Sequence, residues 1–429
     1  MRASARLART VETDSRLLSP QADAERKGAN SNRPRGNPRS LAGATILQLV
    51  PALRDDPPGH TAVDIALALL QSGARAIIAG EGGPLVGEVR AFGGEWLPMT
   101  NDTFNPLRIR GNTQRIANLI AGERIDIVHA HSAGAAWSAI AATDRMPVFL
   151  VTSFPDQLAA ESWPSTLFGR SLARGDRVIA PSSYVSRAVI ERYKIAPDRI
   201  TVIPRAVDTV GFSPVAISAD RIAALRRVWG ILPQMRVVLV PGRIAPWNGQ
   251  MSMIDAARIL VGGGGRNIAF VFAGEDRGQA RYARALRRQA RMHGIDTLCR
   301  MVGHCADMPA ACAVADVVVV PALQPPLAGR AVAEAQAMGR PVVATTVGVL
   351  PENVLCPPRM KEELRTGWLV RPGNVGELAR AVASALALDV TSYEALGARA
   401  RQFAEFMFSS QSVAEAIRGV YTSLLARDA

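Results

Sequence analysis

The feature that most constrains this chain is a repeated alternation of short, almost wholly apolar runs with longer stretches of helical apolar spacing. Strands buried on both faces read as continuous apolar runs, and helical stretches between them supply the crossover connections of parallel strands. The pattern therefore predicts parallel sheets covered by helices on both faces. The expected strands of the first series are Ala44–Val50, Ala74–Ala79, Ile125–His129, Pro147–Thr152 and Arg177–Ala180. The expected helices are Thr61–Gln71, Pro106–Gly122, Ser132–Thr143 and Ser182–Tyr193.

A second series of the same kind follows. Its expected strands are Arg236–Pro241, Asn267–Ala273, Leu298–Val302, Asp316–Val320 and Pro341–Ala344. Its expected helices are Gly249–Leu260, Gln279–His293, Asp307–Val314 and Gly329–Met338, and Ser410–Leu425 reads as one more amphipathic helix. With 429 residues the chain is long enough for two doubly wound α/β domains. In open sheets of this class ligands bind at the carboxyl ends of the strands, so the loops there are where chemistry is expected.

Four segments follow from this pattern. We expect a disordered basic tail over 1–40, a first Rossmann-like domain over 41–210, a second over 211–405, and a terminal helix over 406–429. The first 40 residues carry nine basic and four acidic groups and no apolar core, which excludes a secretory signal. No apolar run reaches the roughly 18 residues of a membrane span. We expect a cytoplasmic protein, in peripheral contact with the inner face of a membrane.

The charge of the chain is strongly positive, at +13, and 47 of its 50 basic residues are arginine. Such a bias is typical of codon usage as much as of function. A basic body favours anionic ligands, including phosphates and an anionic membrane face. Nucleic-acid binding is the third hypothesis that this charge raises, but no basic patch with interleaved aromatic residues supports it.

The most informative loop follows the first strand of the second series. Arg243 leaves a strand end beside Gly242, where its fork of donors suits a diphosphate; the alternative is an ordinary surface arginine. Gly329 begins a later helix, whose first N–H groups can bind an anion. Glu334 lies one turn into that helix and could accept hydrogen bonds from ribose hydroxyls, or could be a solvated helix carboxylate.

Five motifs of this chain resemble bacterial glycosyltransferases of the "group 1", or family 4, type, in order and spacing from residue 44 to 426. The motifs are 126–130 (DIVHA), 175–182 (GDRVIAPS), 203–208 (IPRAVD) with Phe212, 315–345, and 366–370 (TGWLV). The resemblance implies the GT-B fold, in which two Rossmann-like domains face a cleft. It further implies a nucleotide-sugar donor bound mainly by the second domain, an acceptor bound mainly by the first, and a terminal helix that crosses back to the first.

The resemblance assigns candidate donor-binding residues. Arg243 matches the arginine of an Arg–Lys pair that binds the donor diphosphate, and Asn248 stands at the lysine position. Gly329 and Arg330 begin the donor-site helix, and Glu334 matches the second of two glutamates that contact the sugar and the ribose. The catalytic residue is left unassigned. No cofactor or metal is expected, because protein dipoles and cations stabilise the leaving diphosphate in this architecture.

Several positions of the chain depart from the family pattern. Asn248 lacks the charge of lysine, Pro326 stands where the first glutamate is expected, and Pro155 follows a strand after which a histidine is common. Two hypotheses follow. The first is a retaining, metal-independent hexosyltransferase of cell-envelope or lipopolysaccharide-type glycan synthesis, acting on a glycan or lipid-linked acceptor. The second is a catalytically impaired relative that keeps the fold for binding or for pairing with a partner.

Histidines and cysteines raise two further alternatives. His129 ends a buried strand and predicts a structural hydrogen bond, whereas His131 could face a ligand. His293, Cys299, His304, Cys305 and Cys312 invite a zinc hypothesis, but they lack the tight paired spacing of structural zinc sites. Buried thiols and loop histidines explain them better, and the four cysteines indicate a reducing compartment.

Overall fold

The computed structural model describes residues 40–144, 146–155, 169–265, 267–325 and 329–426, and these form two compact units. The first unit comprises the described residues up to Ala180 with Ser186–Val202 and the chain from Ile417. The second comprises Pro181–Val185 and Ile203–Ala416. The expected tail lies outside the described residues, apart from Ser40.

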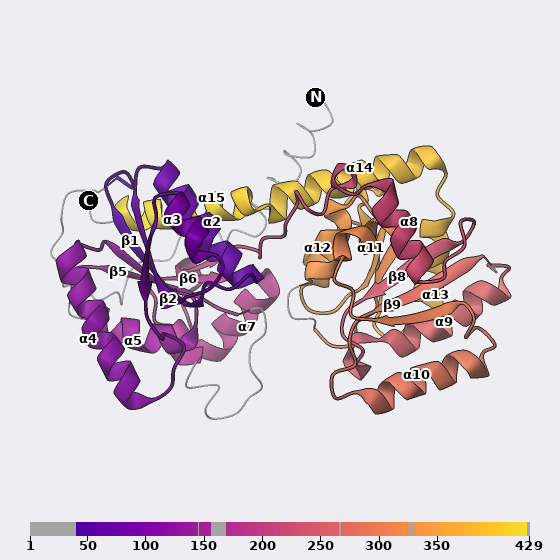
Figure 1. The fold of residues 1–429 in the computed structure, drawn as a ribbon, viewed down its shortest axis with the longest axis horizontal. Coiled ribbons are helices and arrows are strands. Elements are labelled where there is room, and N and C mark those ends of the chain that lie inside the picture. The colour runs from indigo at the N-terminus through magenta and orange to yellow at the C-terminus, as the bar shows by residue number, and fades with distance from the viewer. Residues whose placement is uncertain (1–39, 145, 156–168, 266, 326–328, 427–429) are drawn as a thin grey trace. The chain divides into compact units, whose positions relative to one another are not determined.

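The first unit is built on a seven-stranded sheet in the order β3-β2-β1-β4-β5-β6-β7, and every neighbouring pair is parallel (Figure 1). Its strands are β1 (Thr45–Ala52), β2 (Arg75–Glu81), β3 (Glu95–Pro98), β4 (Ile127–Ala130), β5 (Phe149–Ser153), β6 (Arg177–Ala180) and β7 (Ile200–Val202). The helices between them are α2 (Pro57–Gln71), α3 (Val86–Ala91), α4 (Pro106–Glu123), α5 (Ala133–Thr143) and α7 (Ser183–Tyr193).

The second unit is built on a six-stranded parallel sheet in the order β10-β9-β8-β11-β12-β13. Its strands are β8 (Arg236–Pro241), β9 (Ile268–Ala273), β10 (Cys299–Gly303), β11 (Val317–Val320), β12 (Val342–Thr345) and β13 (Gly367–Val370). Its helices are α8 (Ala219–Val228), α9 (Gln250–Gly262), α10 (Ala280–Met292), α11 (Met308–Val314), α12 (Arg330–Ala337), α13 (Val375–Leu386) and α14 (Val390–Phe408), and α15 (Ser410–Leu425) ends the chain.

Two apolar layers enclose the second sheet, one on each face. Val237 and Leu239 of β8 pack with residues of α11, α12 and α14, whereas Val238 and Val240 pack with residues of α9, α10 and α13 (Figure 1). Successive strand residues point to opposite faces, so a continuous apolar run is what a sheet covered on both sides requires. The expected α/β class with two parallel-sheet, Rossmann-like units is confirmed.

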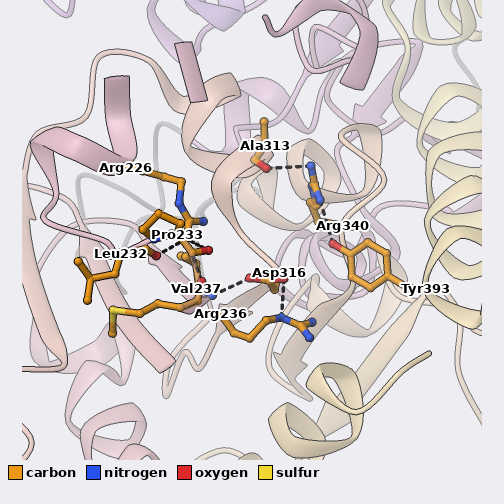
Figure 2. A network of polar contacts seen from close by, with 10 residues as sticks. Arg226, Leu232, Pro233, Arg236, Val237, Ala313, Asp316, Arg340 and Tyr393 are labelled. Carbon is orange, nitrogen blue, oxygen red and sulfur yellow. Dashed lines mark hydrogen bonds and ion pairs between the residues drawn. The ribbon is translucent and has the colours of Figure 1, made fainter. Parts of the chain in front are cut away.

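An aspartate directly before a strand ties it to the strand beside it, in both units. The Asp316 carboxylate accepts from the Val237 N–H at 2.7 Å and from Arg236 Nε at 2.6 Å, which joins the starts of β11 and β8 (Figure 2). Asp126 accepts from the Thr45 N–H at 2.9 Å, and so joins β4 to β1 in the same way. Asp126 and Asp316, which belong to two of the quoted motifs, therefore fix strand alignment at the amino-terminal edge of each sheet.

The strand and helix bounds agree with the sequence pattern best in the centre of each sheet. Arg177–Ala180, Arg236–Pro241 and Ser410–Leu425 are as expected, and the other expected elements shift by a few residues. The pattern did not predict β3 and β7, the two edge strands of the first sheet, because they are short and only partly buried. It also did not predict β13, α3, α8, α13 and α14. No helix among the described residues is long and apolar enough to cross a bilayer.

The end of α15 completes the core of the first unit. Tyr421 is fully buried, and its hydroxyl lies 2.7 Å from Nδ1 of His129 on β4. The other ring nitrogen of His129 lies 2.7 Å from the Ser153 hydroxyl at the end of β5. The structural hydrogen bond predicted for His129 is confirmed, and burial raises the pKa of the Tyr421 hydroxyl.

Candidate functional site

The loop after β8 places Arg243 at the carboxyl edge of the second sheet. Its side chain is exposed, and Nη2 donates to the Arg277 carbonyl of the β9–α10 loop at 2.6 Å. The guanidinium carbon also lies 5.9 Å from the ring centre of Trp247. The guanidinium is thus anchored on one side and keeps further N–H donors for a ligand.

The Asn248 side chain turns back onto this loop. Its Nδ2 donates to the Arg243 carbonyl at 2.7 Å, and Gln250 Nε2 donates to the same oxygen at 2.8 Å. Both amides therefore brace the backbone that carries the arginine.

Close backbone contacts lock the β8 loop to the loop after β11. Gly249 has a φ of +72°, and a Cβ built on it would lie 1.8 Å from the Pro321 carbonyl oxygen. The Leu323 N–H donates to the Trp247 carbonyl at 2.8 Å, and the Thr345 hydroxyl at the end of β12 donates to the Ala322 carbonyl at 2.7 Å. Three neighbouring strand ends are thereby held together as one surface.

Helix α12 begins on that same edge. Gly329 precedes it with a φ of +60°, and a Cβ on it would lie 2.5 Å from Asn353 Nδ2. Since the first N–H groups of a helix have no acceptor within it, the start of α12 offers donors and a positive dipole end to an anion. Glycine is required here by both the left-handed backbone and the lack of space.

Glu334 lies one turn into α12 and is only 7% exposed. Burial raises the pKa of its carboxyl, the Arg330 guanidinium beside it opposes that rise, and the Asp208 carboxylate adds to it. Arg330 Nε donates to Glu334 Oε1, so the two side chains form a pair within the helix. The alternative of a solvated helix carboxylate is wrong, because this carboxyl is enclosed.

The five predicted residues thus fall into two groups on one edge. Arg243 and Asn248 share the β8 loop, whereas Gly329, Arg330 and Glu334 share the start of α12. Pro326 lies outside the described residues. The sequence did not suggest the bracing roles of Gln250 and Asn353, since an amide that binds a backbone carbonyl leaves no spacing signal.

His131 is half-buried in the first unit, with Nε2 3.1 Å from Gln48 Oε1 and its ring centre 4.0 Å from that of His129. The cysteines are free thiols, and burial raises the pKa of Cys299 to about 12 and that of Cys312 still further. Within the described part of the chain, His, Cys, Asp and Glu do not gather in threes that could hold a metal. A pocket of about 590 Å³ lies between α8 and β10, and none of the five predicted site residues lines it.

Two family models match the two units of the chain. Residues 59–210 match the model of Glycosyltransferase Family 4, and residues 235–387 match that of Glycosyl transferases group 1. The chain belongs to this glycosyltransferase family. The resemblance drawn from the sequence motifs is confirmed.

Individual glycosyltransferases are similar to this chain over different spans. The D-inositol 3-phosphate glycosyltransferase of Geodermatophilus obscurus is 30% identical over 258 residues, which are 59% of this chain and 53% of that protein. The corresponding enzyme of Mycolicibacterium vanbaalenii is 29% identical over 287 residues, 62% of this chain and 60% of its own length. The chain therefore matches little more than half the length of these curated relatives.

Solved structures of glycosyltransferases share the fold over most of the chain. A glycosyltransferase from Rickettsia africae has a TM-score of 0.75 and 25% identity, over 89% of this chain and 99% of that one. HepE from Anabaena, solved in complex with UDP, has a TM-score of 0.68 and 21% identity, over 88% and 100%. These likenesses confirm the GT-B fold.

Proposed function

We propose that this chain transfers a hexosyl group from a nucleoside-diphosphate sugar to a hydroxyl acceptor, without a metal and with retention. The observation that carries the proposal is the locked edge of the second sheet. It places Arg243 on the β8 loop, which the contacts of Gly249 and Trp247 hold to the loop after β11. The start of α12 lies on the same edge, and the enclosed Glu334 lies one turn into that helix. Such a surface fits a diphosphate beside a ribose.

In this assignment each group has one role. Arg243 and the first N–H groups of α12 bind the diphosphate and stabilise the charge that develops as it leaves. Glu334 accepts from the ribose hydroxyls, and Arg330, which donates to Glu334 Oε1, favours the ionised form of that carboxyl against the effect of burial. The UDP complexes of the structurally similar HepE support a uridine nucleotide as the first donor to test.

The test is titration calorimetry of the full chain with UDP, GDP and ADP. We expect one of them to bind, and Arg243→Ala to weaken that binding about 10- to 150-fold, the range for a hydrogen-bonded charge. Arg380→Ala, which removes an exposed arginine of α13, is the matched control and should leave binding unchanged. If none of the three nucleotides releases heat, the proposal fails.

For the acceptor we propose a hydroxyl of a glycan or lipid-linked precursor of the cell envelope, made on the cytoplasmic side. The names of the curated relatives supply a second acceptor to test, an inositol phosphate. A transfer assay with each acceptor and the nucleotide sugar that binds distinguishes them. Transfer to inositol phosphate alone would overturn the envelope-glycan assignment.

A catalytically impaired binding protein is the second candidate, and Asn248 favours it. This amide braces the loop where the family has a cation, so the leaving diphosphate lacks one positive charge. Nucleotide binding without hydrolysis or transfer, unchanged in Asn248→Lys, would establish this candidate. Faster transfer in Asn248→Lys would instead identify a slow enzyme.

A further inference from the structure

Helix α10 of the second unit carries an unusual concentration of positive charge. Its 13 residues include Arg281, Arg284, Arg287, Arg288 and Arg291, and none of them is acidic. Ala283, Leu286 and Ala290 are buried in the layer that α10 shares with α9, and all five arginines are exposed. At about 100° per residue the five arginines cover an arc of roughly 120° opposite the buried face.

These arginines lack counter-ions within the part of the chain that the structure describes. Other exposed arginines of the same unit are paired, such as Arg221 with Asp307 and Arg371 with Glu377, but no ion pair among the described residues involves α10. The Asp255 carboxylate of α9 lies 2.8 Å from His293 Nε2 and 2.9 Å from Nε2 of Gln289 on α10. Arg258 of α9 is exposed as well and adds to the charge.

Five uncompensated arginines on one helix face repel one another, and an external anionic surface removes that repulsion. The planar fork of arginine matches phosphate oxygens in particular. Two extended phosphate surfaces exist, a nucleic acid and an anionic bilayer. The only aromatic residue of α10, Tyr282, is half-buried, so it offers no free ring on which a base could stack.

The exposed apolar side chains near this face favour the bilayer. Met292 at the end of α10 is 62% exposed, and Ile259 of α9, next to Arg258, is 44% exposed. Single apolar side chains among arginines suit the boundary between headgroups and acyl chains, where phosphates attract the charge and the apolar groups leave water. We propose that the arginine face of α10 docks the protein onto a membrane rich in anionic phospholipid.

The test is co-sedimentation of the full chain with vesicles of phosphatidylcholine alone or mixed with equal parts of phosphatidylglycerol. We expect binding only to the mixed vesicles, and loss of that binding between about 0.1 and 0.5 M salt as the charges are screened. The variant R284Q/R288Q/R291Q should bind on the order of a hundredfold more weakly, at roughly fivefold per arginine. Glutamine is a good helix former, so the helix should persist.

Two further variants keep the result interpretable. R284K/R288K/R291K retains the charge and should bind within a few-fold of the natural chain. R124Q/R227Q/R380Q removes three exposed arginines elsewhere in the chain. It should also bind the mixed vesicles within a few-fold of the natural chain. Equal losses in the two glutamine variants, or equal binding to both kinds of vesicle, would overturn the proposal. So would an oligonucleotide duplex that binds through α10 when vesicles do not.

Discussion

Removing the Asp316 carboxylate should loosen the amino-terminal edge of the second sheet by an amount that the structure lets us calculate. In Asp316→Ala the N–H of Val237, a fully buried residue, loses its acceptor, which costs about 1–3 kcal/mol. The Asp316 side chain is 26% exposed and that of Arg236 is 42% exposed, so loss of their ion pair adds at most about 1 kcal/mol. We therefore expect a total loss of about 1–4 kcal/mol in the free energy of unfolding.

Asp316→Asn separates the two contributions. The carboxamide oxygen can still accept from the Val237 N–H, so only the charge is lost, and we expect about 1 kcal/mol. Urea unfolding gives both values, and hydrogen exchange of the Val237 amide locates the effect. Asp126→Ala is the matched variant in the first unit, and it should speed exchange at Thr45 but not at Val237. If Val237 exchange is unchanged in Asp316→Ala, or if the asparagine variant costs as much as alanine, the reasoning is refuted.

Four shorter predictions follow from other parts of the molecule. Gly249→Ala should abolish nucleotide binding in calorimetry, because a Cβ cannot lie 1.8 Å from a carbonyl oxygen and the loop must move; normal binding would contradict this. Tyr421→Phe removes a buried partner of His129 and should cost about 1–3 kcal/mol in urea unfolding, whereas a neutral result would show that the ring alone matters. Burial raises the pKa of Glu334, so between the unfolded and the folded pKa the folded state binds a proton that the unfolded state releases. This carboxyl therefore lowers the free energy of unfolding as pH rises through that range. Glu334→Gln should therefore reduce the fall in unfolding free energy above about pH 4.3, and an identical pH profile would argue against an enclosed carboxyl. Since burial raises the pKa of Cys312, that thiol should react with a disulfide reagent only after denaturation, as mass spectrometry of labelled peptides would show.

The sequence predicts the central strands well because their physical signal is strong. Val317–Val320 and Arg236–Pro241 are apolar runs that only a doubly covered strand can bury, and Asp316 marks where the first of them begins. The edge strand Ile200–Val202 is partly exposed and three residues long, so it carries no such signal. Helix α14 holds polar and aromatic residues with weak periodicity, and its buried face is defined by packing against the core of the second unit, which includes α12.

Some features of the candidate site could be predicted from the sequence, and others could not. Position in the chain was enough to predict that Arg243 and Gly329 lie at strand ends, because parallel sheets bring those ends to one edge. Sequence could not predict that Asn248 turns inward to the Arg243 carbonyl, since an amide at that position could equally meet solvent. Nor could it predict the burial of Glu334, which depends on elements distant in sequence.

The buried position of Tyr421 has a consequence for how the chain matures. Its ring fills the interior of the first unit and its hydroxyl contacts His129, yet it follows that histidine by 292 residues in the sequence. During synthesis the amino-terminal strands leave the ribosome long before this residue is made. The first unit therefore cannot reach its final packing until the second unit, Ile203–Ala416, has been synthesised, and a truncation before Tyr421 would damage the part of the protein that was made first.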